Sequence, residues 1–86
     1  MDTLTQFRLE VLSKLIQGKA RDYIDEHYGS VGFNVFKARQ VIHKDILSNL
    51  TYEIDSNVLD DMIRVAISIA IAELKAELND ENIFIL

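Results

Sequence analysis

Residues 58–78 read VLDDMIRVAISIAIAELKAEL, and their apolar side chains recur on almost every side of a helix. At about 100° per residue, the polar side chains fall on one narrow stripe. That stripe consists of Asn57, Asp61, Arg64, Ser68 and Lys75. A helix that is apolar on nearly all sides has to be covered on nearly all sides. We therefore expect other segments of the chain, or a second molecule, to surround this helix.

The rest of the chain provides few other segments, and those are also helical in pattern. The 86 residues contain no proline and only three glycines, which favours helices throughout. Thr3 and Gln6 have the spacing of a capping box, and Gly29 suits the residue just past a helix end. These signals predict a first helix over 3–28. Asn34 is a suitable N-cap for a second helix over 35–49, and Asp55 for the third.

The apolar positions predict which face of each helix is buried. In the first helix one face carries Leu4, Phe7, Val11, Leu12, Leu15 and Ile16, and beyond Gly18 the apolar face is rotated. A glycine at such a change of phase is typical of a kink. In the second helix the apolar arc holds Val35, Phe36, Ile42, Ile46, Leu47 and Leu50.

Together these features predict an all-α fold: a small three-helix bundle forming one domain over 1–86. Two helices are too few to surround a third one, which normally needs at least three neighbours. We therefore expect a homodimer, the commonest closed assembly. The expected dimer or partner interface is Met62, Ala66, Ile67, Ile69, Ala70 and Ile71, with Phe84, Ile85 and Leu86 of the tail. The alternative is that the first two helices enclose the third completely.

The C-terminal tail ends in four large apolar residues, although chain ends are usually polar. It could close the chain's own core or anchor a partner. It could also pair as a short strand with residues 51–54, which favour β structure. The residues leave these alternatives open.

The net charge of −5 is unevenly distributed: residues 31–50 carry +2 and residues 51–86 carry −6. Such asymmetry can steer a partner. We expect a protein–protein interaction module, either an adaptor, a regulatory subunit or a stoichiometric inhibitor. Its acidic side chains Asp60, Asp61, Glu73 and Glu77 would face a basic partner.

Arg39 and His43 fall inside the apolar arc of the second helix. We therefore expect Arg39 to pair with Asp60 or Asp61, and His43 to form a hydrogen bond at the edge of the core.

The alternative function is a dimeric helix-turn-helix DNA-binding regulator that contacts nucleic acid through Lys37, Arg39 and Lys44. Recognition helices usually belong to broadly positive surfaces, whereas this chain is acidic. Nucleic acid is therefore the less favoured partner.

Catalytic chemistry has no motif to support it. The chain has no cysteine, and its two histidines, His27 and His43, lie on different helices without a metal-binding spacing. We expect no enzyme activity, no cofactor and no metal, a site of His27 with neighbouring carboxylates being the weak alternative. The first residues do not form a secretory signal, and no apolar run approaches the roughly 20 residues that span a bilayer. We expect a cytoplasmic protein.

Overall fold

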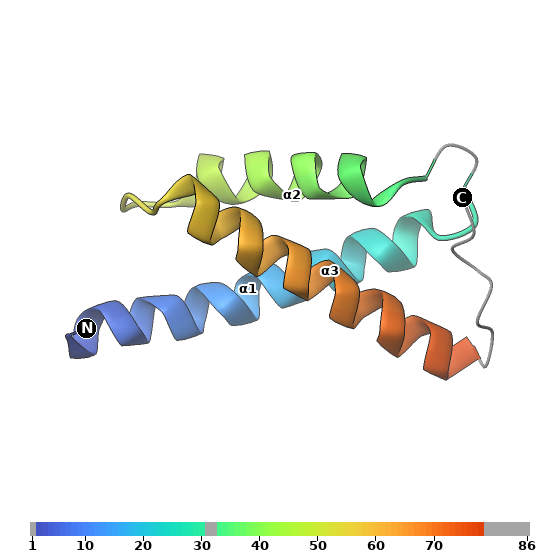
Figure 1. Cartoon of the computed structure of the whole chain (residues 1–86), viewed down its shortest axis with the longest axis horizontal. Helices are drawn as coiled ribbons and strands as arrows, with labels where there is room; N and C mark the ends of the chain where they lie inside the picture. The colour runs from blue at the N-terminus through green and yellow to red at the C-terminus, as the bar shows by residue number, and fades with distance from the viewer. Residues whose placement is uncertain (1, 31–32, 79–86) are drawn as a thin grey trace.

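Three helices pack together in the computed structural model, which describes residues 2–30 and 33–78. They are α1 (Thr3–His27), α2 (Val35–Asn49) and α3 (Ser56–Leu78). The helix α3 crosses α1 and also contacts α2, so it joins the other two (Figure 1). The described part of the chain contains no strand. The predicted all-α, three-helix fold is confirmed, whereas pairing of 51–54 with the tail involves residues outside the described ranges and stays a prediction.

Side-chain caps set where each helix begins. The Asn34 side chain accepts a hydrogen bond from the backbone N–H of Lys37 at 2.7 Å, and Asp55 accepts from the N–H of Asn57 at 2.8 Å, as predicted. The first cap was predicted one residue too late. Asp2, not Thr3, accepts from the N–H of Thr5 at 2.7 Å, because a carboxylate is a stronger acceptor than a hydroxyl.

Glycine has a defined role at the end of α1 but not in its middle. Gly29, just past the last residues of α1, has φ of +77°, the left-handed conformation expected there. Gly18 lies inside the helix, which continues through it. The buried residues of α1 recur at every fourth position: Leu12, Ile16, Ala20 and Ile24. Because a helix has 3.6 residues per turn, a row of every fourth residue gradually rotates around the helix axis. The rotation of the apolar face therefore does not require a kink in α1 at Gly18.

The core is entirely apolar among the described residues, and α3 supplies more of it than either other helix. Its six buried residues are Leu59, Ile63, Ala66, Ile67, Ala70 and Leu74. The second helix adds Ala38, Ile42 and Ile46, and Phe33 closes the end next to the α1–α2 turn.

Several apolar residues predicted to be buried are instead at the surface. On α1 these are Leu4, Phe7, Val11 and Leu15, and on α2 they are Phe36 and Leu47. The reason is geometric: α1 and α2 each turn only one side toward the other helices, and that side is already filled by the rows described above. The buried faces of α1 and α2 are therefore narrower than the apolar faces that the sequence predicts.

Candidate interaction surface

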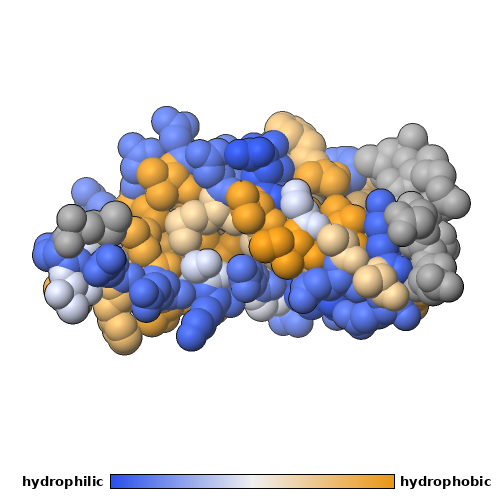
Figure 2. Space-filling model, turned by 60° about the horizontal axis from the view of Figure 1, so that its bottom comes forward, coloured by the Kyte–Doolittle hydropathy of each residue, from blue (hydrophilic) through white to orange (hydrophobic). Residues whose placement is uncertain are grey.

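The outward side of α3 carries a second row of apolar residues that the other two helices do not cover. We call Val58, Val65, Ile69, Ala72 and Ala76 the outer strip; all five are exposed. Half of the surface of Val65 and 41% of that of Ile69 are accessible to solvent. Figure 2 shows apolar surface along the middle of one face of the molecule, bordered by hydrophilic side chains.

The expected interface residues divide between the core and this surface. Ala66, Ile67 and Ala70 are buried within the chain, so they lie behind the outer strip and support it. Met62 and Ile71 are half-buried against the core, and Ile69 alone of the α3 set is exposed. Phe84, Ile85 and Leu86 lie outside the described residues. The sequence pattern shows that α3 is apolar on two sides, but it does not show which side faces α1 and α2.

A shallow groove of about 260 Å³ borders the outer strip on the side of α1. Ser13 and Gln17 of α1 form one wall, and Met62 and Val65 of α3 are part of the other. The combination of an exposed apolar row and a groove beside it suits a partner helix, whose side chains need ridges and recesses to pack against.

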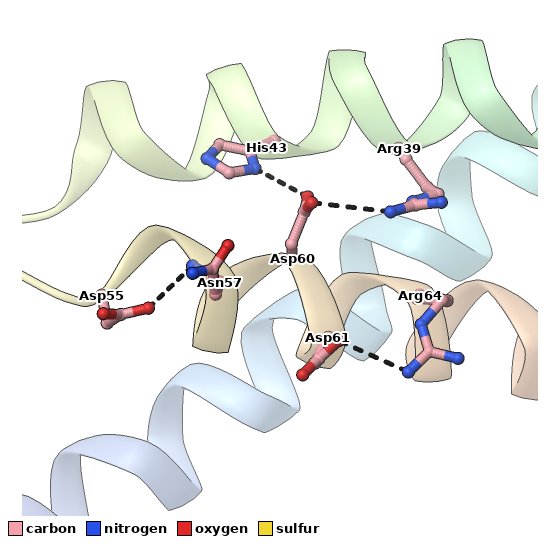
Figure 3. A network of polar contacts seen from close by, with 7 residues as sticks. All are labelled: Arg39, His43, Asp55, Asn57, Asp60, Asp61 and Arg64. Carbon is pink, nitrogen blue, oxygen red and sulfur yellow. Dashed lines mark hydrogen bonds and ion pairs between the residues drawn. The ribbon is translucent and has the colours of Figure 1, made fainter.

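Asp60 connects α3 to α2 through two cationic or ionisable side chains (Figure 3). His43 Nδ1 lies 3.1 Å from Asp60 Oδ1, and Arg39 Nη2 lies 3.5 Å from Asp60 Oδ2. The carboxylate can only accept, so Nδ1 of His43 carries the donated hydrogen. Arg39 Nε is buried and has no hydrogen-bond partner among the described residues. The predicted pairing of Arg39 with an acid of α3, and the predicted hydrogen bond of His43, are confirmed.

Arg21 connects the other end of α3 to α1. Its guanidinium donates two hydrogen bonds to the Glu77 carboxylate, at 2.7 and 2.8 Å, and one to Asp25 at 2.9 Å. Glu73 lies 3.9 Å from the same guanidinium. The hydrogen bonds from Arg21 hold the pKa of the Glu77 carboxyl below its usual range. The sequence gives no signal for this pair, because its members are 56 residues apart.

These ion pairs involve the acidic side chains that the sequence predicts would face a basic partner. Asp60, Glu73 and Glu77 each lie near an arginine of another helix, and Asp61 lies 3.4 Å from Arg64 within α3. All four carboxylates expected to face a basic partner therefore already have a cation within the chain. Their charge is partly neutralised before any partner arrives.

The three expected nucleic-acid contacts are not equivalent either. Arg39 turns toward Asp60, while Lys37 and Lys44 are exposed and form no ion pair among the described residues. Lys44 lines a groove of about 420 Å³, which we call the α2 groove. Its lining consists of Phe36, Arg39, Gln40, His43, Lys44, Leu47 and Asp60. Sequence reasoning missed it because Phe36 and Leu47 were assigned to the core.

Comparison with known proteins identifies no relative: no family model, no curated protein and no solved structure matches the chain. None of the helices in residues 2–30 and 33–78 is long and apolar enough to cross a membrane. Within the same residues, no three His, Asp or Glu side chains are grouped so that they could hold a metal ion.

Proposed function

We propose that this protein is a protein–protein interaction module that acts as a homodimer through the outer strip of α3. The observation that supports this most is the exposure of Val58, Val65 and Ile69 in one row. Exposed apolar rows of this kind mark interaction surfaces in folded proteins. Two copies related by a twofold axis would present the same row to each other.

The chemistry of the outer strip suits the close approach of two helices. Ala72 and Ala76 are one turn apart, and their small side chains let a second helix come near the backbone of α3. A helix of 23 residues is about 35 Å long, which allows several turns of contact. A stable interface buries about 800 Å² on each copy, so the walls of the neighbouring α1–α3 groove have to contribute as well.

The role we infer for the dimer is that of an adaptor, a regulatory subunit or a stoichiometric inhibitor. Support comes from the apolar residues that remain exposed away from the outer strip, on α1 and α2, because they leave surface for a second protein once two copies have paired. The intramolecular ion pairs of Asp60 and Glu77 make an acidic docking face less favoured than the sequence indicates.

Sedimentation equilibrium tests the dimer directly. We expect the natural chain to have the mass of two copies at tens of micromolar, and the double variant Val65→Gln/Ile69→Gln to have the mass of one copy while keeping its helical circular dichroism. Val41→Gln is the matched control, since Val41 is similarly exposed but lies on α2. A natural chain that is monomeric at millimolar concentration, or a double variant that still dimerises, would refute the proposal.

DNA binding is the second candidate, and it is supported by the two exposed lysines Lys37 and Lys44 on one helix. The third expected contact to DNA, Arg39, is less available, because its guanidinium pairs with Asp60. Titration of labelled duplex DNA across a salt series tests it. Micromolar affinity that falls steeply with salt, and that is lost in Lys37→Ala/Lys44→Ala, would favour this function over the first.

A further inference from the structure

The α2 groove has an exposed apolar side chain at each end. Phe36 is 65% exposed and Leu47 is 49% exposed, the former value being the highest among the large apolar residues described. The two are eleven residues apart on α2, which places them about 16 Å apart on one side of the helix. Aromatic side chains such as Phe36 are enriched in protein interfaces, and an exposed leucine adds apolar surface that a partner can cover.

Between these ends the groove is basic. Lys44 and Arg39 line it together with His43, and Asp60 is the one carboxylate among its lining residues. That carboxylate is already shared by Arg39 and His43, and Lys44 has no ion pair among the described residues. Residues 31–50, which supply every other lining residue, carry +2 in a chain of −5. The groove therefore complements a ligand that is both apolar and negatively charged.

The groove is separate from the outer strip. None of its lining residues belongs to the strip, and Asp60, its single contribution from α3, points toward α2 (Figure 3). Pairing of two copies through the outer strip would leave the α2 groove open. One molecule could then use the two surfaces at the same time.

We propose that the α2 groove binds an acidic amphipathic helix of a partner protein. Two apolar residues of that helix, about eleven positions apart, cover Phe36 and Leu47, and its carboxylates face Lys44, the lining cation that forms no ion pair among the described residues. This is the helix-in-groove mode of recognition. A nucleic acid fits less well, because it would place phosphates beside the two exposed apolar side chains at the ends of the groove. The inference rests on the proposed role as an interaction module, but not on the dimer.

The test uses fluorescein-labelled synthetic helices of 18 residues titrated with the full chain. Four peptides each carry two leucines eleven residues apart and differ in the positions of their glutamates. In a second, matched set of four peptides, lysine replaces every glutamate. We expect micromolar binding of at least one glutamate peptide and none of its lysine counterpart. Phe36→Ser and Lys44→Glu should each weaken binding tenfold or more.

Two control variants make the same chemical changes elsewhere. Val41→Ser alters an exposed apolar residue on another part of α2, and Lys14→Glu reverses an exposed charge on α1; both should bind within twofold of the natural chain. The proposal is wrong if no glutamate peptide binds, if both peptide sets bind alike, if Phe36→Ser and Lys44→Glu bind like the controls, or if duplex DNA binds through Lys44 instead. A dimer without peptide binding rejects this inference alone, and peptide binding by a monomer rejects the dimer alone.

Discussion

A polar contact between single side chains joins α2 to α3. Asp60 is the acceptor for both Arg39 and His43, and all three are partly buried between the two helices. Removing one partner of a buried polar pair leaves the other without its hydrogen bond, which costs more than the bond itself contributes. The neighbouring residue Asp61 differs, because it is exposed and, within residues 2–30 and 33–78, its one ion pair is with Arg64 of its own helix.

We therefore expect Asp60→Ala to lower the free energy of unfolding by about 1–2 kcal/mol. Asp61→Ala should lower it by less than about 0.5 kcal/mol, as is usual for an exposed pair on one helix. Urea unfolding followed by circular dichroism measures both. Equal effects of the two substitutions would show that the Asp60 contacts do not hold α2 in place.

The contact between Arg21 and Glu77 gives the protein a component of stability that depends on pH. The hydrogen bonds from Arg21 lower the pKa of Glu77 below its ordinary value of 4.5 in the folded chain. The stabilisation is therefore complete above about pH 4.5 and is lost as the pH falls through the lowered folded value. Glu77 is exposed and Arg21 is partly exposed, so salt screens the effect.

The expected result is that Glu77→Gln unfolds at lower urea concentration than the natural chain at pH 7, with the difference shrinking as the pH falls below 4.5. Urea midpoints at a series of pH values, at low ionic strength, check this. A difference that stays constant from pH 7 to pH 3 would mean that the ionised carboxylate does not stabilise the fold.

The three helices differ from their sequence-based predictions in orientation rather than in extent. Asn34 and Asp55 could be identified because a cap bonds to backbone groups two or three residues away, which is local information. The correct face of α2 could not be obtained in the same way, since Phe36 and Leu47 are as apolar as Ile42 and Ile46. Which of them are buried depends on where α1 and α3 lie, and that is decided by contacts distant in sequence.

The orientation of α2 can be checked with two adjacent residues. Ile46 is fully buried and Leu47 is half exposed. Ile46→Ala should reduce the free energy of unfolding by about 2–5 kcal/mol through the cavity it leaves. Leu47→Ala should change it by about 0.5 kcal/mol or less, as for a surface substitution. Urea unfolding of the two variants separates the cases, and a larger effect of Leu47→Ala would mean that α2 is rotated.

The whole molecule is elongated, with extents of 42, 22 and 18 Å, and its helices share one central α3. Two helices leave part of a third uncovered: Val58, Val65 and Ile69 are exposed on the side of α3 that faces away from the core. The sequence alone does not predict which side of α3 is exposed, because Ile67 and Ile69 are equally apolar. Their different burial follows from which side of α3 faces α1 and α2.

Disulfide cross-linking tests most directly whether a second copy packs against α3. The chain has no cysteine of its own, so a disulfide between single introduced cysteines must join two copies. Single cysteines would replace Val58, Val65, Ile69, Ala72 and Ala76 in turn, with Val41→Cys and Gln40→Cys as controls on α2. A twofold dimer brings the residue nearest its axis within the roughly 7 Å between Cα atoms that a disulfide allows. We predict rapid covalent dimers at micromolar concentration from at least one position of the outer strip and none from the controls. Failure of all five positions to cross-link, or equal cross-linking at Val41, would contradict the account.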